Sequence, residues 1–167
     1  GTKEVAVEGG EEGETDNPSV LANRRCRARA IMATLLLSVG TPMLFAGDEF
    51  LHTQMGNNNP YCQDNVLTWL CWEAVDGDDA EFVRRLIALR RKLKIYEKKR
   101  FFTGKYGPDG IKDMVWYNEN GKEFADADWY DGNRKALSYC VYRNGCFVQP
   151  SAVDVLPDGT FLVTDSG

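Results

Sequence analysis

The sequence is poor in the residues that build metal sites and disulfide frameworks. It holds one histidine, His52, and five cysteines, an odd number with no CxxC pair among them. A disulfide framework or a zinc ribbon is therefore poorly supported, and we expect the cysteines to be buried free thiols. His52 could join Cys62 and Cys71 only in an irregular metal site, so neither a metal nor another cofactor is expected.

Long apolar runs and an excess of basic charge are also lacking. No stretch approaches 18 consecutive apolar residues, and the first 16 residues, GTKEVAVEGGEEGETD, have neither the basic nor the apolar region of a secretory signal. The formal net charge of −5 gives no broad attraction to nucleic acid or to anionic membranes, so neither is an expected partner. Free thiols favour a reducing, intracellular location, in either cytoplasm or plastid.

What the chain does contain begins with a strong helix signal. Asn17 and Pro18 predict an N-cap and a first helical turn, and apolar residues recur near helical spacing from there to Gly40. The arginines inside this helix are expected on a solvated or salt-bridged face. The apolar run Pro42 to Ala46 then predicts a short strand covered on both faces. A long polar loop with several aromatic residues, 47–72, follows; loops of this kind are packed on a scaffold and functional.

The character of the sequence changes near residue 100. Before it, a second helix is predicted from Asp79, as N-cap, through Tyr96, with cations at its end (Lys98, Lys99, Arg100). After it, short β-rich runs separated by turn residues predict an antiparallel β region: 111–118, 137–144, 146–149 and 160–165. The sequence therefore predicts two domains, 1–100 and 101–167.

Two adjacent acids, Asp48 and Glu49, follow the predicted strand and suggest a glycosidase carboxylate pair. Neighbouring side chains of a strand point to opposite faces, whereas a retaining glycosidase needs two carboxyl groups about 5 to 5.5 Å apart across one bond. At most one of the two can face a site. The other is expected to accept hydrogen bonds from the loop.

The run of three asparagines at 57–59 allows two interpretations of equal weight. Its amides suit hydroxyl-rich ligands such as sugars, with nearby aromatic rings to stack on them. The alternative is a turn capped by its own side chains.

A resemblance favours the first interpretation. The block ATLLLSVGTPMLFAGDEFLHTQMGNNNPYCQDNVLTWLCWE closely resembles the isoamylase-type glycogen and starch debranching enzymes of the α-amylase superfamily (glycoside hydrolase family 13). The flanking segments VEGGEEGETDNPSVLANRR, FVRRLIALRRKL and DMVWYNENGKEFADADWYDGNRKALSYCVYRNG are similar to that family too. The resemblance implies an α+β fragment: the last helices and strand of a TIM (β/α)₈ barrel, then a partial antiparallel β-sandwich-like domain.

The resemblance also implies a reaction, the retaining hydrolysis of α-1,6 branch linkages in glycogen or starch. The three catalytic acids of the family are expected upstream of residue 1, so no catalytic role is carried onto this chain. The residues expected to line the substrate wall are Asp48, Asn57, Asn58, Asn59, Tyr61 and Asp64, with Glu49 and Asn65 as supporting hydrogen bonders. The four tryptophans are expected to pack between the barrel portion and the β domain.

Two kinds of partner follow from this reading. One is a branched α-glucan: glycogen, amylopectin or a limit dextrin. The other is the missing part of the barrel or a full-length homologue. The alternative function is a catalytically silent glucan-binding or scaffolding module, and a weaker one is an independently folded α+β domain with another role.

Overall fold

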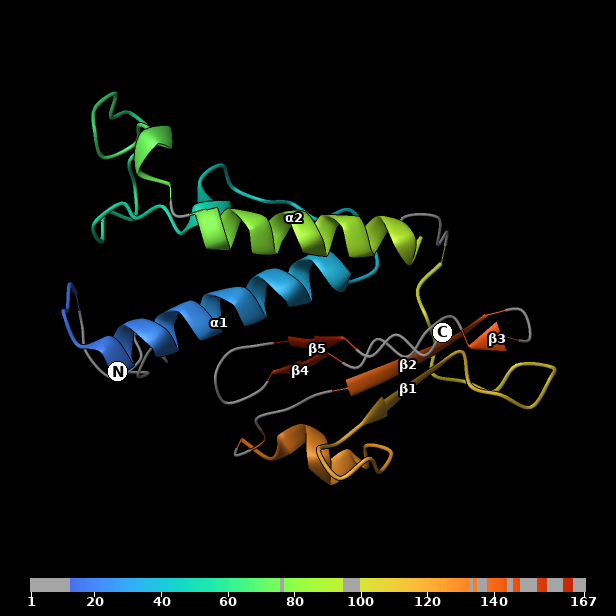
Figure 1. Cartoon of the computed structure of the whole chain (residues 1–167). Coiled ribbons are helices and arrows are strands. Elements are labelled where there is room, and N and C mark those ends of the chain that lie inside the picture. Colours follow the sequence, from blue (N-terminus) through green and yellow to red (C-terminus); the bar gives the residue numbers. More distant parts are fainter. Residues whose placement is uncertain are drawn as a thin grey trace. The chain divides into compact units, whose positions relative to one another are not determined.

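The chain is an α+β structure whose parts form two compact units, Gly1–Tyr96 and Glu97–Gly167 (Figure 1). A computed structural model describes residues 13–75, 77–94, 100–132, 134, 138–143, 146–147, 153–155 and 161–163. The assignment of the first unit to a barrel and of the second unit to a β domain remains a prediction from the sequence. Each unit is described by itself below.

The first helix, α1 (Pro18–Leu37), begins where the sequence predicts. The side chain of Asn17 accepts a hydrogen bond from the Ser19 backbone N–H at 3.1 Å, and Pro18 occupies the first turn. The helix ends three residues before Gly40, because the Ser38 amide and hydroxyl both bond to the Thr34 carbonyl and close the last turn. Ile31 is 60% exposed, so the apolar residues of α1 are not all covered within this chain.

The second helix, α2 (Gly77–Lys92), packs alongside α1. The buried apolar residues of the two helices are Val20, Met32, Ala33, Leu36 and Leu37 of α1 and Val83 and Leu86 of α2. Two helix-end predictions are wrong. Asp79 is not the N-cap, because the helix already begins at Gly77 and the Asp79 carboxylate is bound by arginines of α1. The helix does not continue to Tyr96, because Lys94 has a φ of 51°. Tyr96, Lys98 and Lys99 lie outside the described residues.

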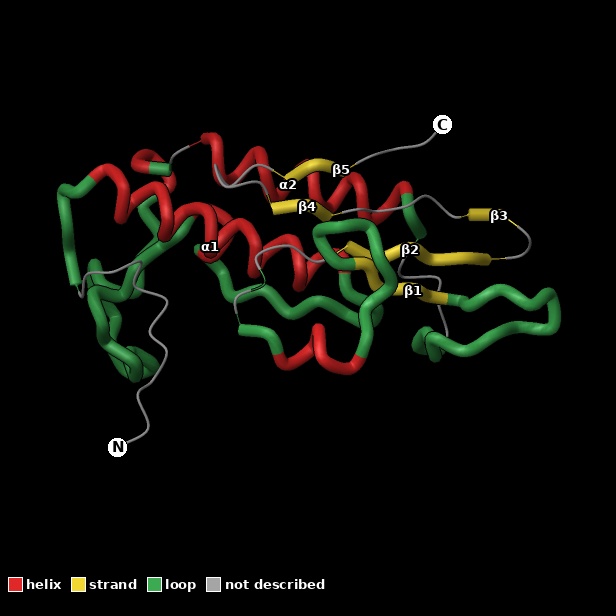
Figure 2. The backbone as a smooth tube through the Cα atoms, turned by 90° about the horizontal axis from the view of Figure 1, so that it is seen from below, coloured by secondary structure: helices red, strands yellow, loops and turns green. Residues whose placement is uncertain are grey.

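The predicted strand Pro42 to Ala46 does not form. The segment has no ladder partner among the described residues, and Met43 is 88% and Phe45 64% exposed. A strand requires a neighbour to accept and donate its backbone hydrogen bonds, and no described segment of this chain lies in position to do so. The long loop that follows joins α1 to α2 and is drawn in green in Figure 2.

The second unit confirms the antiparallel β prediction. The strands β1 (Met114–Tyr117), β2 (Ser138–Arg143) and β3 (Cys146–Phe147) form one sheet, in which Met114 pairs with Val141 and Tyr117 with Ser138. A second, two-stranded sheet joins β4 (Val153–Val155) to β5 (Phe161–Val163). The run around β4 was not predicted as a strand. Whether these sheets belong to a sandwich stays a prediction.

Trp116 and Trp129 pack within the second unit. Trp129 lies in the short 3₁₀ helix η4 (Asp126–Tyr130), with its ring 5.6 Å from that of Trp116 and 4.7 Å from that of Phe124. The Arg134 guanidinium sits over the Phe124 ring at 5.5 Å. This aromatic cluster is the packing that holds η4 against the β1–β2 pair.

Candidate functional site

The candidate site is the loop between α1 and α2, and its base is organised around Gly47. The Gly47 carbonyl accepts hydrogen bonds from the backbone N–H groups of Phe50 (3.1 Å) and His52 (3.0 Å), and its own N–H donates to Glu49 Oε2 at 2.8 Å. Gly47 has a φ of 104°, and a Cβ there would lie 2.8 Å from the Cβ of His52. Only glycine fits this position without a shift of the chain.

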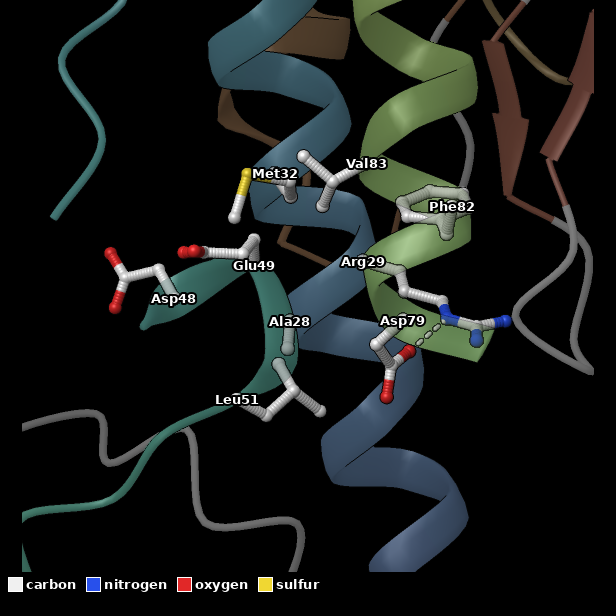
Figure 3. A pocket seen from close by; sticks show the side chains of 9 residues that line it. All are labelled: Ala28, Arg29, Met32, Asp48, Glu49, Leu51, Asp79, Phe82 and Val83. Carbon is white, nitrogen blue, oxygen red and sulfur yellow. Dashed lines mark hydrogen bonds and ion pairs between the residues drawn. The ribbon is translucent and has the colours of Figure 1, made fainter. Parts of the chain in front are cut away.

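The two adjacent acids differ in their surroundings, and they lie in a 3₁₀ helix rather than a strand. This helix, η1 (Asp48–Phe50), packs against α2. Figure 3 shows Asp48 projecting away from the two long helices, and Asp48 is exposed. Glu49 is half-buried and bonds back to Gly47. Asp48 is therefore the one acid of the pair whose carboxylate is turned to solvent.

A shallow depression lies between η1 and the two helices (Figure 3). Its walls include Ala28 and Met32 from α1, Val83 from α2, and Leu51 from the loop, and it has scarcely room for one water molecule. A glucan ring cannot enter it. The depression marks where the loop base packs on the helices, and most of the predicted site residues lie farther along the loop.

The asparagine run forms a turn at the tip of the loop. Asn57 Oδ1 accepts the backbone N–H of Asn59 at 2.9 Å, and the Asn57 N–H donates to the Gln54 carbonyl at 2.9 Å. Asn57 thus caps its own turn, the alternative left open by the sequence. The side chains of Asn58 and Asn59 are exposed and make no hydrogen bond with another described residue, and Tyr61 is 87% exposed.

A second turn, 63–69, carries the remaining predicted site residues. Asn65 Oδ1 accepts the Leu67 N–H at 2.9 Å, and Asp64 Oδ1 accepts the indole N–H of Trp69 at 2.7 Å. His52 Nε2 lies 3.2 Å from the Leu67 carbonyl oxygen and so joins this turn to the loop base. Asp64 and Trp69 are both exposed, which leaves an acid and an indole face side by side at the surface.

The loop is less packed than its aromatic content predicted. Phe50 is half-buried and meets Trp72 edge-on at 5.2 Å, but Tyr61, Trp69 and Trp72 are exposed. The base of the loop rests on α2, whereas its tip finds no surface to cover among the described residues. The predicted wall residues therefore lie on one continuous loop rather than around a closed pocket.

The cysteines are free where the structure describes them, but the prediction that they are buried is wrong, because none of the four described cysteines is fully buried. Cys62 and Cys71 are exposed, and Cys26 and Cys140 are half-buried. The exposed pair lies on the loop, whose open surface the sequence did not reveal. The Cys146 side chain lies outside the described residues. Within the part of the chain that the structure describes, no group of three or more His, Cys, Asp or Glu residues could hold a metal ion.

Two residues that organise this loop were missed by the sequence reading. One is Gly47, whose role as a hydrogen-bond centre shows only in three dimensions. The other is Arg90, which is 7% exposed and bonds to carbonyls at the end of α1. Arg90 follows Val83 and Leu86 at helical spacing, so an arginine in the buried stripe of α2 was a signal that could have found it.

Comparison with known proteins gives the same family as the motifs. A "Glycogen operon protein GlgX homolog" of Mycobacterium tuberculosis is 41% identical over 140 residues, 81% of this chain and 19% of the relative. The "Glycogen debranching enzyme" of Klebsiella pneumoniae is 42% identical over 123 residues, 74% of this chain and 18% of the relative. That of Serratia proteamaculans is 39% identical over 132 residues, 79% of this chain and 19% of the relative. The chain belongs to the isoamylase-type glycogen debranching enzymes.

The chain spans about a fifth of the length of these relatives. No family model matches the chain. These relatives are bacterial, so nothing among them supports the plastid alternative. None of the helices in the described residues is long and apolar enough to span a membrane.

Proposed function

We propose that this chain forms part of a glycogen or starch debranching hydrolase and supplies one wall of its glucan-binding site. The proposal rests on one observation: the segment whose sequence resembles the debranching family is also the segment whose polar and aromatic side chains are exposed. The segment 47–69 lies in the block that resembles the debranching family. It exposes the amides of Asn58 and Asn59, which have no partner among the described residues, and the rings of Tyr61 and Trp69. Polar amides and flat rings suit a sugar chain, which offers hydroxyl groups at its edges and apolar faces.

The reaction proposed is retaining cleavage of α-1,6-glucosidic branch linkages. It needs one carboxylate as nucleophile and one carboxyl group as general acid, about 5 to 5.5 Å apart. We place these acids outside the chain, in the part of the enzyme that the relatives contain and this sequence does not span. The proposed roles here are binding roles: Asn58, Asn59 and Tyr61 in and beside the asparagine turn, Asp48 at the start of the loop, and Asp64 in the second turn.

The barrel assignment is also a proposal, and the segment Pro42 to Ala46 supports it. Its apolar side chains Met43 and Phe45 are exposed in this chain, a costly arrangement for a run of that composition. In a barrel, strands on either side would supply backbone partners and cover both faces. The exposed Ile31 of α1 is explained in the same way, as a position that a neighbouring element of the barrel covers.

A transplant experiment tests the enzymatic proposal. The matching segment of the Klebsiella pneumoniae debranching enzyme is replaced by the corresponding part of this chain, and reducing ends released from glycogen are measured. We expect the hybrid to debranch glycogen and the isolated 167-residue chain to release none. A soluble, folded hybrid without activity would favour the silent glucan-binding module, and saturable debranching by the isolated chain would contradict the placement of the acids.

Binding is tested separately by electrophoresis of the isolated chain through gels containing glycogen. We expect retarded migration, and weaker retardation after Asn58→Ala and Asn59→Ala are combined, because these side chains have no structural partner among the described residues. Asn57 is left unchanged, since it caps the turn. Asn120→Ala, an exposed asparagine of the second unit, is the matched control and should leave migration unchanged.

A further inference from the structure

The guanidinium of Arg90 in α2 is inserted at the C-terminal end of α1. Its Nη1 donates to the carbonyl oxygens of Leu36 at 2.6 Å and Ser38 at 2.7 Å, and its Nη2 donates to that of Gly40. Arg90 is 7% exposed, so these bonds are made away from water. Three carbonyls that are spread over five residues converge on one side chain.

These carbonyls need a donor from elsewhere. The last turn of a helix leaves carbonyl oxygens without intrahelical partners and carries a partial negative charge. α1 has no basic residue in its last turn, and the amide and hydroxyl of Ser38 are directed back to Thr34. Arg90 therefore supplies both the hydrogen bonds and the positive charge that this helix end lacks.

The same contact fixes the start of the candidate loop. Gly40 has a φ of 115° and opens the segment that leads to Asp48. At the far end of that segment, η1 packs against α2 again, around Val83. The stretch from Ser38 to Leu51 is thus fastened to α2 at two points, while Met43 and Phe45 between them are exposed.

We infer that Arg90 is a positioning residue for the glucan-facing loop: it fixes where the chain leaves α1 and so the place of the Gly47 hydrogen-bond centre. A direct contact of Arg90 with substrate is not part of the inference, because its Nη1 and Nη2 groups are bound to backbone carbonyls. The inference rests on the proposed function only for the ligand. Its structural part, that the loop base depends on Arg90, rests on the hydrogen bonds of Arg90 and on the packing of η1 against α2.

The test compares three variants of the whole chain at a temperature at which circular dichroism shows all of them folded. Arg90→Gln removes both the positive charge and the planar set of N–H donors of the guanidinium. Arg90→Lys keeps the charge but not that set of donors. Arg91→Gln changes the exposed neighbour on the same helix and is the control. Amide hydrogen exchange is followed at Ser38, beside the contact, and at Phe50 and His52, whose N–H groups bond to Gly47.

We expect exchange at Phe50 and His52 to be about tenfold faster in Arg90→Gln than in the wild type, partly restored in Arg90→Lys, and unchanged in Arg91→Gln. Retardation in glycogen gels should weaken in the same order. Faster exchange confined to Ser38, with Phe50 and His52 as in the wild type, would overturn the inference, because Arg90 would then only cap α1.

The two proposals fail differently. If the wild-type chain is not retarded by glycogen, the glucan-binding role is wrong for the isolated chain, and the exchange at Phe50 and His52 still decides the role of Arg90. If glycogen retards Arg90→Gln as strongly as the wild type and exchange is unchanged, the positioning role is wrong and glucan binding stands.

Discussion

The Oδ1 atom of Asp79 lies 2.7 Å from Nε of Arg29, and the carboxylate that makes this bond is almost entirely buried. The other oxygen, Oδ2, lies 2.8 Å from Nε of Arg25. The Arg29 guanidinium also sits 5.1 Å from the centre of the Phe82 ring. One acid of α2 thus joins two arginines of α1, and the two helices are held by charge as well as by their apolar core.

We predict that Asp79→Asn lowers the free energy of unfolding of the first unit by about 1–3 kcal/mol, because two half-buried arginines lose this charged contact. The arginines are partly exposed, which keeps the loss below that of a fully buried pair. Urea unfolding followed by far-UV circular dichroism measures it.

Glu81→Gln on the same helix is the control for Asp79→Asn. Glu81 pairs with Arg84 and Arg85 at the surface, one turn away, and such pairs contribute about 0.5 kcal/mol. An equal loss in the two variants would mean that burial adds nothing to the Asp79 contacts.

Local signals predicted the fold well where the determining contacts are themselves local. The start of α1 follows from Asn17 and Pro18, because the cap and the first turn involve only neighbouring residues. The positions of the strands around Val115 and Cys140 follow from short β-rich runs between turns, although the pairing of the two strands does not. These predictions needed no knowledge of the rest of the molecule.

Predictions that depended on distant partners were wrong. Pro42 to Ala46 has the composition of a buried strand, but no described strand lies beside it. Aspartate is favoured at the N-cap of a helix, but the carboxylate of Asp79 is bound instead by two arginines, 50 and 54 residues earlier in the chain. For the candidate site, the sequence predicted which loop carries it but not the hydrogen-bond centre at Gly47, because the close approach of Gly47 to His52 is a property of the folded turn.

Gly47→Ala should destabilise the first unit by about 2–4 kcal/mol. The added Cβ would meet the Cβ of His52 at 2.8 Å and a Leu70 methyl group at 3.0 Å, and the φ of 104° is itself unfavourable for alanine. Denaturant unfolding measures the loss. Because the Gly47 carbonyl holds two loop amides, retardation by glycogen should weaken in the same variant.

Gly56→Ala separates the steric effect from the backbone effect. Gly56 also has a positive φ, 79°, but a Cβ there would meet nothing within 4 Å. We expect it to cost about 1 kcal/mol, the backbone term alone. A loss as large as that of Gly47→Ala would contradict the view that the close approach to His52 is decisive.

Cysteine reactivity should report the openness of the loop. Cys62 and Cys71 are exposed, whereas burial raises the pKa of the Cys140 thiol in β2 and lowers its thiolate fraction. With iodoacetamide at mildly alkaline pH, we expect the two loop cysteines to be alkylated at least about tenfold faster than Cys140. Peptide mass spectrometry measures each rate. In denaturant the difference should vanish, and a difference that persists there would show that it does not arise from the fold.

The second unit should lose stability on acidification through Glu119. Hydrogen bonding to its own backbone N–H, and then to the guanidinium of Arg134, holds the pKa of Glu119 below its ordinary value of 4.5. Both carboxylate oxygens lie 2.7 Å from Arg134 Nη1. A group whose pKa is lowered in the folded state stabilises that state fully above its unfolded pKa, and the contribution disappears as pH falls through the folded pKa.

Glu119→Gln should therefore reduce the unfolding free energy at neutral pH and flatten its decline below about pH 4.5. The carboxylate is exposed, so the effect is small, and thermal melts of wild type and variant across the acidic range measure it as a difference in slope. Asp126→Asn, an exposed acid of η4 that makes no ion pair with another described residue, is the control. Equal slopes for wild type and Glu119→Gln would mean that the Glu119–Arg134 pair forms equally in the unfolded chain, because only a pKa difference between the two states makes stability depend on pH.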